Sequence, residues 1–336
     1  MSTWLVTGAA GFIGSNFVRQ LLEEEPGAMV IGFDALSYAG NLENLEDCQA
    51  CGRFRFVRGD ICDPQAVREV LGDGVEVLVN FAAETHVDRS IMGCGEFIRT
   101  NVQGVQVLLD ETRRGEVGRF VQVSTDEVYG SLGPTGKFSE TGPRRPNSPY
   151  SASKAAADML VLAYHHTYGL PGVVTCCSNN YGPYQFPEKL IPLFITNLLE
   201  GRKVPLYGDG LNIRDWIHVS DHCRAIRLVA RRGRPGEVYN VGGNNERSNL
   251  EITRLLLELL GQDESMIQPV PDRPGHDRRY AVDTGKIEGE LGWRPRVQFE
   301  AGLAETVAWY QANQGWWRRV KNKEYLAYYA RQYAHA

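Results

Sequence analysis

The stretch Trp4-Leu5-Val6-Thr7-Gly8-Ala9-Ala10-Gly11-Phe12-Ile13-Gly14 joins a short apolar strand to a glycine-rich turn. Apolar residues then recur at helical spacing as far as Leu22, which predicts a helix directly after the turn. Glycines at such a junction allow a tight turn, a close approach of the backbone to a pyrophosphate and close packing of the helix on the strand. The start of the helix would present free N–H groups and a positive dipole to the phosphates. The stretch therefore predicts a dinucleotide-binding turn that involves Gly8, Gly11 and Gly14.

A second apolar strand, residues 29–33, ends at Asp34, which lies 20 residues after Gly14. An acidic residue at this distance accepts hydrogen bonds from the adenine ribose hydroxyls and repels a 2′-phosphate. The sequence therefore predicts NAD, rather than NADP, as the cofactor.

Strands and helices continue to alternate after this unit. Further strands are predicted at 54–58, 75–81, 119–123 and 172–178, and helices at 97–112 and 150–168. Repeated β-α units with short connections indicate an α/β fold, a Rossmann-type doubly wound parallel sheet. Ligands of such sheets collect beyond the carboxyl ends of the strands, where Asp34, Asp60, Ala82 and Thr125 all fall.

The second half of the chain has a different character, because proline, glycine and asparagine become frequent from Asn179 onward. Helices are predicted at 189–199, 249–260 and 301–313, and strands at 204–207, 213–218 and 238–241. We expect the strands at 213–218 and 238–241 to return to the main sheet. The predicted organisation is an NAD-binding domain of residues 1–178 with 212–243, a smaller interleaved substrate-binding domain of 179–211 with 244–315, and a C-terminal tail of 316–336.

Tyr150 and Lys154 stand four residues apart at the start of the predicted helix 150–168, so they share one face of it. A phenol has a pKa of about 10, and it is a poor base at neutral pH unless a cation favours the phenolate. We expect Lys154 to be that cation, with the positively charged nicotinamide as a second. The pair is therefore a candidate acid–base site.

Composition restricts the class of protein. A net charge of −5 argues against a nucleic-acid partner. No charged leader precedes the first strand and no run reaches the roughly 18 apolar residues of a membrane span, which predicts a soluble cytoplasmic protein. The seven cysteines are odd in number and scattered, which fits a reducing compartment. Cys48 and Cys51 form a Cys-x-x-Cys without a second pair, so we expect ordinary thiols and no metal site.

Several longer strings, taken with the glycine turn and the Tyr-x-x-x-Lys pair, carry a resemblance to a known family. They are DALSYAGN at 34–41, AAETHVDRS at 82–90, STDEVYG at 124–130, NNYGPYQFPEKLIP at 179–192 and DRPGHD at 272–277. The sequence resembles the extended short-chain dehydrogenase/reductases that act on nucleotide sugars, and most closely the dTDP-glucose 4,6-dehydratases among them. The most specific string is Thr125-Asp126-Glu127, because the related decarboxylases and GDP-mannose dehydratases keep the glutamate without the aspartate.

The resemblance implies a reaction in which dTDP-glucose becomes dTDP-4-keto-6-deoxyglucose. Bound NAD would oxidise C4, water would leave across C5–C6, and the hydride would return to C6. Tyr150 would be the base at the C4 hydroxyl, and Lys154 would bond the nicotinamide ribose. Thr125 would bind the C4 oxygen, Glu127 would take the C5 proton, and Asp126 would protonate the leaving hydroxyl.

The same resemblance implies the binding residues and the partners. Expected contacts of the cofactor are Gly8, Gly11, Phe12, Ile13, Gly14, Asp34, Ser37, Asp60, Ile61, Phe81, Ala82, Ala83, Thr85, Thr100, Tyr150, Lys154 and Asn180. Expected contacts of the substrate are Thr85, His86, Thr125, Glu127, Asn179, Lys189, Leu190, Pro205, Tyr207, Arg214, Asn249, Arg273 and His276. The small-molecule substrate would be dTDP-glucose, and a homodimer would form through the helices 97–112 and 150–168.

Two alternatives stay open at this point. One is an NAD-dependent epimerase or decarboxylase on a related nucleotide sugar, against which Asp126 beside Glu127 argues. The other is a non-catalytic NAD-binding sensor or scaffold, against which the intact set of Thr125, Tyr150 and Lys154 argues.

Overall fold

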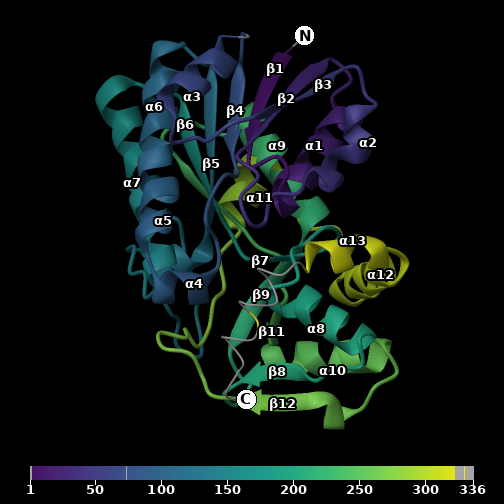
Figure 1. Cartoon of the computed structure of the whole chain (residues 1–336). Helices are drawn as coiled ribbons and strands as arrows, with labels where there is room; N and C mark the ends of the chain where they lie inside the picture. The colour runs from purple at the N-terminus through teal and green to yellow at the C-terminus, as the bar shows by residue number, and fades with distance from the viewer. Residues whose placement is uncertain (1, 73, 322–328, 330–336) are drawn as a thin grey trace.

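The computed structural model describes residues 2–72, 74–321 and 329. Its largest feature is a seven-stranded sheet of order β10-β6-β5-β4-β1-β2-β3, in which every neighbouring pair is parallel (Figure 1). The strands are β1 (Ser2–Thr7), β2 (Ala28–Asp34), β3 (Phe54–Arg58), β4 (Val77–Asn80), β5 (Arg119–Thr125), β6 (Gly172–Cys177) and β10 (Val238–Val241). The chain order reverses between β1 and β4, which is the switch point of a doubly wound sheet. The predicted Rossmann-type fold is confirmed.

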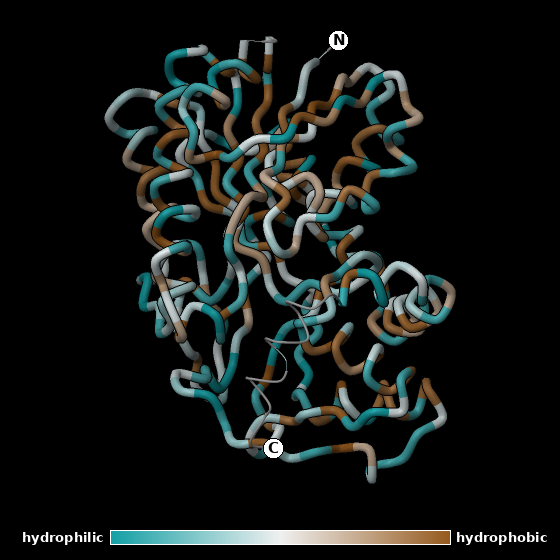
Figure 2. The backbone as a smooth tube through the Cα atoms, in the orientation of Figure 1, coloured by the Kyte–Doolittle hydropathy of each residue, from teal (hydrophilic) through white to brown (hydrophobic). Residues whose placement is uncertain are grey.

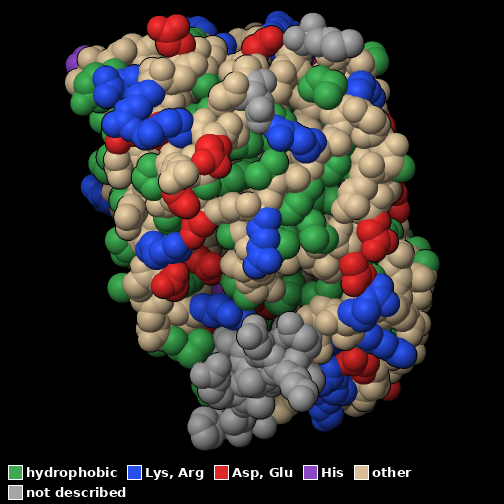
Figure 3. All heavy atoms as spheres, turned by 45° about the horizontal axis from the view of Figure 1, so that its top comes forward, with side chains coloured by type: hydrophobic (Ala, Val, Ile, Leu, Met, Phe, Trp, Pro, Cys, Tyr) green, Lys and Arg blue, Asp and Glu red, His purple; other side chains and the backbone are tan. Residues whose placement is uncertain are grey.

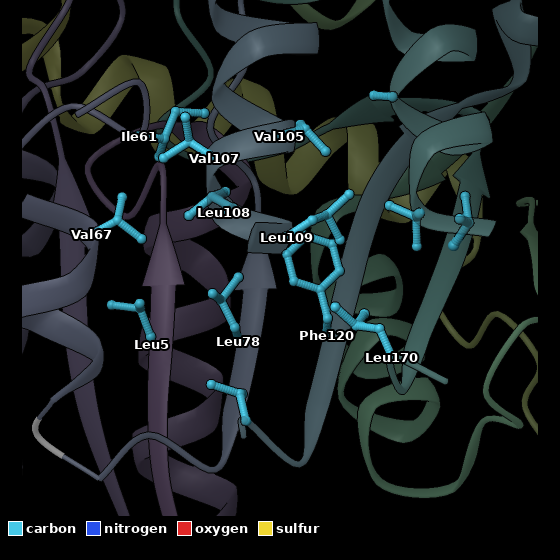
Figure 4. Close-up of a cluster of buried hydrophobic side chains, with 14 of the residues drawn as sticks. Leu5, Ile61, Val67, Leu78, Val105, Val107, Leu108, Leu109, Phe120 and Leu170 are labelled. Atoms are coloured by element: carbon cyan, nitrogen blue, oxygen red, sulfur yellow. The ribbon is translucent and has the colours of Figure 1, made fainter. Parts of the chain in front are cut away.

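Helices cover both faces of this sheet (Figure 1). One face packs against α1 (Phe12–Glu24) and α9 (Val219–Arg232), and the other against α3 (Pro64–Leu71), α6 (Val105–Arg114) and α7 (Pro149–Tyr168). Because both faces are covered, the strands are almost continuously apolar, as in Trp4-Leu5-Val6. Figure 4 shows one of the hydrophobic clusters along the sheet, in which Phe120 of β5 lies near Leu109 of α6.

The predicted helix 97–112 is interrupted in one place. It consists of α5 (Gly95–Ile98), a π-helical segment η2 (Arg99–Gly104) and α6. A π turn inserts an extra residue into a helix and is frequent at functional sites. Here it contains Thr100 and Asn101. Thr100 lines the cavity described below, and Asn101 forms hydrogen bonds with the loop that follows β4.

A second hydrophobic core lies below the carboxyl edge of the main sheet (Figure 1). It is built from α8 (Leu190–Leu199), α10 (Asn249–Leu259), α12 (Phe299–Ala312) and α13 (Gln314–Val320), beside a parallel pair of β8 (Val204–Tyr207) and β12 (Ile267–Val270). Trp317 is fully buried in this core, so the first part of the predicted tail is core rather than an appendage. The rest of the tail, 322–328 and 330–336, lies outside the described residues.

The prediction that residues 213–218 return to the main sheet is wrong. β9 (Ile213–His218) belongs to a separate three-stranded sheet of order β11-β9-β7, with β7 (Asn179–Tyr181) and β11 (Glu246–Ser248), and not to the main sheet. The edge of β6 is already paired along its length with β10, so it offers no ladder to β9. β9 pairs instead with β7, which continues the chain just beyond β6. The prediction that 238–241 returns to the main sheet is confirmed.

The remaining short elements connect these layers. They are η1 (Leu42–Leu45), α2 (Glu46–Gln49), α4 (Val87–Met92), η3 (Asp126–Tyr129), η4 (Glu264–Met266) and α11 (Gly285–Leu291).

Polarity follows the layering. Hydrophobic residues concentrate along the central strands and the inner helices (Figure 2). On the face drawn in Figure 3, Lys and Arg are interspersed with Asp and Glu rather than gathered in one basic patch. Of the helices that the structure describes, none combines the length and apolar character needed to cross a bilayer.

Candidate active site

A cavity of about 500 Å³ lies at the carboxyl edge of the main sheet. Residues that follow the strands line its upper part: Gly8 after β1, Asp34 at the end of β2, Asp60 after β3, Phe81 after β4 and Thr125 at the end of β5. Residues of the second core close it from below, among them Leu190 of α8 and Pro205 of β8. Every residue that the sequence predicted for catalysis, cofactor or substrate lies on the wall of this one cavity. Their individual roles remain predictions.

The glycine turn leaves no room for side chains where a pyrophosphate would lie. Gly8 has a φ of +65°, and a Cβ added to it would stand 2.6 Å from the backbone nitrogen of Ala82. A Cβ on Gly14 would stand 2.2 Å from the carbonyl oxygen of Gly8. No described side chain caps the start of α1 behind Gly11, so its first N–H groups are not taken by a side-chain cap. The turn therefore fits the diphosphate of a dinucleotide.

Asp34 is held rigidly at the end of β2. Its two carboxylate oxygens accept hydrogen bonds from the backbone N–H groups of Ala10, at 2.9 Å, and Leu36, at 2.8 Å. A carboxylate has about four acceptor positions, so capacity for two ribose hydroxyls remains. Asp34 therefore fits the adenosine side of NAD, as the sequence predicted.

The turn after β5 carries the predicted catalytic carboxylates. Thr125 ends the strand and caps η3, because its Oγ1 accepts from the backbone N–H of Glu127 at 3.3 Å. Asp126 is the first residue of η3 and is 1% exposed. The end of β5 thus places three consecutive polar residues on the wall of the cavity.

Asp126 and Glu127 experience different surroundings. Burial raises the pKa of Asp126 well above its usual range, and the neighbouring carboxylates of Glu127 and Asp215 raise it further. Burial also raises the pKa of Glu127, but Arg273, Lys189 and Arg214 all oppose that rise. The surroundings therefore favour a protonated Asp126 beside a more readily ionised Glu127. Unequal protonation of two adjacent carboxyl groups is what an acid and a base in one site require.

Helix α7 positions Tyr150 and Lys154. A capping box between Ser148 and Ser151, with Pro149 at the first helical position, fixes where the helix begins. Tyr150 therefore lies in the first turn, and its backbone N–H donates to Ser90 Oγ at 3.2 Å. Tyr150 and Lys154 are both buried and line the cavity.

The surroundings of Tyr150 act on its pKa. The Lys154 ammonium donates to the carbonyl oxygen of Val123 at 2.7 Å. Burial raises the pKa of Tyr150 well above 10, and the carboxylate of Glu127 raises it further, opposed by a hydrogen bond with Thr125. Burial and a nearby carboxylate therefore both act against the phenolate, and the role of Lys154 in favouring it stays a prediction.

Three predicted substrate contacts bring positive charge into the lower cavity. Lys189 Nζ donates to the carbonyl oxygen of Thr85 at 2.7 Å, which joins α8 to the loop after β4. Arg273 Nη1 donates to Asp88 Oδ1 at 2.9 Å, and Arg214 Nη2 donates to the carbonyl oxygen of Asp277, also at 2.9 Å. All three cations line the cavity, which suits an anionic ligand.

The two predicted histidines are neutral. Burial lowers the pKa of His86 to about 3, and Lys189 lowers it further. Burial and Arg273 together lower the pKa of His276 to about 4, although its Nδ1 lies 2.6 Å from Asp272 Oδ1. Both side chains can therefore take part only as neutral hydrogen-bonding groups at physiological pH.

Sequence reasoning missed a group of polar residues at the junction of the two cores. Glu188 lines the cavity, and its Oε1 accepts from the hydroxyl of Tyr38 at 3.0 Å. The guanidinium of Arg89 stacks 4.1 Å above the Tyr38 ring. Burial raises the pKa of Glu188 to about 7. All three lie within the strings quoted above, but only the tertiary structure brings residues 150 positions apart together.

The cysteines show no sign of a metal centre. Among the described residues, no group of three or more His, Cys, Asp or Glu side chains could hold an ion. Cys48 and Cys51 are both free, and burial raises the pKa of Cys48 to about 12.

Comparison with known proteins gives one consistent result. A family model described as GDP-mannose 4,6 dehydratase matches residues 5–306. A dTDP-glucose 4,6-dehydratase of Actinoplanes sp. is 57% identical over 93% of this chain and 99% of its own length. The corresponding enzyme of Xanthomonas campestris is 54% identical over 97% of each chain. The chain belongs to the dTDP-glucose 4,6-dehydratase family.

Solved structures of two enzyme families share this fold but differ in their sequence identity to this chain. A dTDP-glucose 4,6-dehydratase from Streptomyces venezuelae, crystallised with NAD bound, superposes with a TM-score of 0.93 at 56% identity and covers 95% of this chain and 100% of that one. A UDP-glucose 4-epimerase from Thermotoga maritima reaches 0.86 at 32% identity, covering 93% and 99%. The fold is thus shared with epimerases, and the dTDP-glucose 4,6-dehydratase family is distinguished by sequence.

Proposed function

We propose that this chain converts dTDP-glucose to dTDP-4-keto-6-deoxyglucose with retained NAD. The observation that carries the proposal is the adjacent pair of a buried Asp126 and a half-buried Glu127. Burial and neighbouring carboxylates raise the pKa of Asp126, whereas Arg273, Lys189 and Arg214 oppose the rise that burial causes in the pKa of Glu127. The pair stands in one cavity with Tyr150 and Lys154. An epimerase needs only the oxidation site, whereas loss of water needs an acid and a base in addition.

The chemistry explains why two carboxyl groups are required. The C5 proton of glucose is not acidic until C4 becomes a ketone. NAD supplies the acceptor for the C4 hydride and the donor for C6, so the reaction is redox-neutral overall. Tyr150, as the phenolate beside Lys154, accepts the proton of the C4 hydroxyl, and Thr125 hydrogen-bonds the C4 oxygen. Glu127 takes the C5 proton and later returns it, while Asp126 protonates the departing C6 hydroxyl.

The substrate's nucleoside diphosphate would lie in the lower cavity. Arg214 and Arg273 offer planar, bidentate donors for diphosphate, and Lys189 adds a point charge near the catalytic turn. Asn249, at the N-terminus of α10, and Tyr207 of β8 line the same region. We propose that Asn179, Leu190, Pro205 and His276 complete this part of the site.

We infer on the same basis which segments of the chain bind NAD and which bind the nucleotide sugar. Residues 1–178 would bind NAD together with α9 and β10, which pack on the main sheet. Residues 179–211 and 244–315 would bind the nucleotide sugar. Within the predicted segment 212–243, β9 is the exception, because it lies in the smaller sheet.

We also propose a homodimer and a cytoplasmic location. Large apolar side chains are exposed on adjoining elements of one side of the molecule: Ile91 and Met92 of α4, Ile98 of α5, and Met159 and Tyr168 of α7. Such a patch suits a second copy of the same surface. All seven cysteines are free, which suits a reducing compartment.

The proposal is tested with purified protein and no added cofactor. The protein is incubated separately with dTDP-glucose, UDP-glucose, UDP-glucuronate and GDP-mannose, and substrate masses are followed. We expect loss of one water from dTDP-glucose. Loss of carbon dioxide from UDP-glucuronate would instead indicate a decarboxylase, and an unchanged mass with a changed NMR spectrum would indicate an epimerase. No change in any substrate, even with NAD supplied, would favour a non-catalytic NAD-binding protein.

A further inference from the structure

Asp158 is a fully buried carboxylate for which the proposed mechanism has no role. It lies in α7, four residues after Lys154 and eight after Tyr150, so all three share one face of the helix. Its exposed fraction is 0%. A buried carboxylate is costly unless it is paired, so its presence in this helix needs a reason.

Asp158 contacts β5, the strand that leads into the turn of Thr125, Asp126 and Glu127, which is called the catalytic turn below. Ser124 Oγ donates to Asp158 Oδ2 at 2.8 Å, and Lys154 Nζ donates to the carbonyl oxygen of Val123 at 2.7 Å. Val123 and Ser124 are consecutive residues of β5, and Thr125 follows them. Helix α7 therefore holds β5 at two adjacent points just before the catalytic turn.

The second oxygen of Asp158 is not used in this way. Oδ1 is buried and has no hydrogen-bond partner among the described residues. A purely structural carboxylate would be expected to satisfy both oxygens, because an unpaired buried acceptor costs about 1–3 kcal/mol.

The ionisable groups that face Asp158 are few. They are Lys154 on the same helix, Arg144 from the preceding loop and Cys176 of β6, whose Sγ is 4.0 Å from Oδ2. Burial lowers the pKa of Lys154, and the charge of Asp158 is the first influence that opposes it, followed by Cys177 and Cys176. Burial raises the pKa of Asp158 itself to about 6, so the carboxylate is mostly ionised at neutral pH.

We propose that Asp158 is a positioning residue of the active site, whose charge keeps Lys154 in its ammonium form and whose bond to Ser124 sets β5 against α7. The inference rests on the proposed function for its catalytic consequence. Its consequence for NAD does not depend on the substrate, because an ammonium at Lys154 is needed to bond the nicotinamide ribose.

The test compares Asp158→Asn, which removes the charge, with Ser124→Ala, which removes the hydrogen bond and keeps the charge. Two quantities are measured across pH: the rate of C4 oxidation of dTDP-glucose, and the rate at which retained NAD exchanges with labelled NAD. For Asp158→Asn we expect oxidation to slow by about tenfold or more, a part of the roughly 10²–10⁴ that proton transfer contributes. The alkaline limb of its pH–rate profile should move to lower pH, because Lys154 then loses its proton more readily. NAD exchange should accelerate, and its pH profile should show the same displacement.

Ser124→Ala should change both rates by only a few-fold and leave the limbs in place. Asp158→Glu should restore the position of the limb even where its rate stays low. A wild-type pH profile in Asp158→Asn, or an equal displacement in Ser124→Ala, would overturn the role of the charge. If circular dichroism shows that Asp158→Asn is unfolded, Asp158→Glu is compared with the wild type instead: its alkaline limb should stay at the wild-type position, and a limb displaced to lower pH would refute the proposal. If the wild type does not act on dTDP-glucose, the proposed function fails while NAD exchange still tests Asp158.

Discussion

At the scale of single residues, Asp126 offers the sharpest test of the mechanism. In Asp126→Asn the C4 ketone can still form and Glu127 can still exchange the C5 proton, but the acid for the C6 hydroxyl is missing. We expect water loss to slow by about 10²–10⁴ while C4 oxidation changes less than tenfold. A single turnover in D₂O measures all three steps, through nicotinamide absorbance, deuterium at C5 and product mass.

Glu127→Gln is the matched comparison for that experiment. It should abolish incorporation of deuterium at C5, which Asp126→Asn retains. Water loss at the wild-type rate in Asp126→Asn would remove the aspartate from the acid role, and deuterium incorporation in Glu127→Gln would assign the base to another group.

Glu188 predicts a pH-dependent change in stability. Its folded-state pKa of about 7 lies above the usual 4.5, so the folded protein binds this proton more tightly than the unfolded chain does. The contribution of Glu188 to the free energy of unfolding is therefore fully present below about pH 4.5 and is lost as the pH rises through about 7. At about 1.4 kcal/mol per pKa unit, the loss amounts to roughly 3 kcal/mol.

Glu188→Gln keeps an acceptor for the Tyr38 hydroxyl and removes the titration. Above pH 7 the variant should be more stable than the wild type by up to about 3 kcal/mol, and the difference should vanish near pH 4.5. Urea unfolding of the cofactor-free protein at several pH values measures this. A difference that does not depend on pH would mean that Glu188 does not titrate as the structure implies.

At the scale of elements, the glycine turn between β1 and α1 leaves no room for an added side chain at Gly8 or Gly14. In Gly14→Ala the new Cβ would stand 2.2 Å from the carbonyl oxygen of Gly8, so the helix must move away from the turn. We expect a loss of about 1–3 kcal/mol in the free energy of unfolding, as for an overpacked core, and NAD that dissociates during purification.

Gly27→Ala is the control for this substitution. Gly27 follows α1 at its other end, and a Cβ there would meet nothing within 4 Å. Its effect on unfolding should stay within about 0.5 kcal/mol, with NAD retained. Equal losses in both variants would contradict the special place of Gly14, because an added methyl group at Gly27 meets nothing within 4 Å.

At the scale of the whole molecule, the proposed dimer depends on apolar side chains of α4, α5 and α7. Met159 of α7 is 60% exposed in the single chain. Met159→Glu would place a charge in the centre of the interface, and we expect sedimentation equilibrium to show a shift from dimer to monomer. Leu259 of α10 is 41% exposed on the other part of the molecule, so Leu259→Glu should leave the dimer intact. A wild-type protein that sediments as a monomer would disprove the interface outright.

Much of this molecule could be predicted from local patterns. Hydrophobic runs ending in Gly8, Asp34 and Thr125 indicated a parallel sheet, because buried parallel strands are apolar along their whole length and ligands gather at their carboxyl ends. The same rule placed Asp34, Asp60, Ala82 and Thr125 at one edge, and they line one cavity together with the residues that the family resemblance implied. The assignment of β9 failed because pairing partners depend on which edge is free, and β10 had already occupied the edge of β6.

The sequence by itself determined the fold class and the dinucleotide turn, since each depends on residues close together in the chain. The catalytic side chains were named from a family resemblance, and their roles stay predictions. Protonation and pairing were decided only by the tertiary structure. Burial raises the pKa of Tyr150 and of Asp126, and burial depends on all surrounding elements together. The contacts of Glu188 with Tyr38 and of Asp158 with Ser124 likewise join distant segments, so no local pattern specifies them.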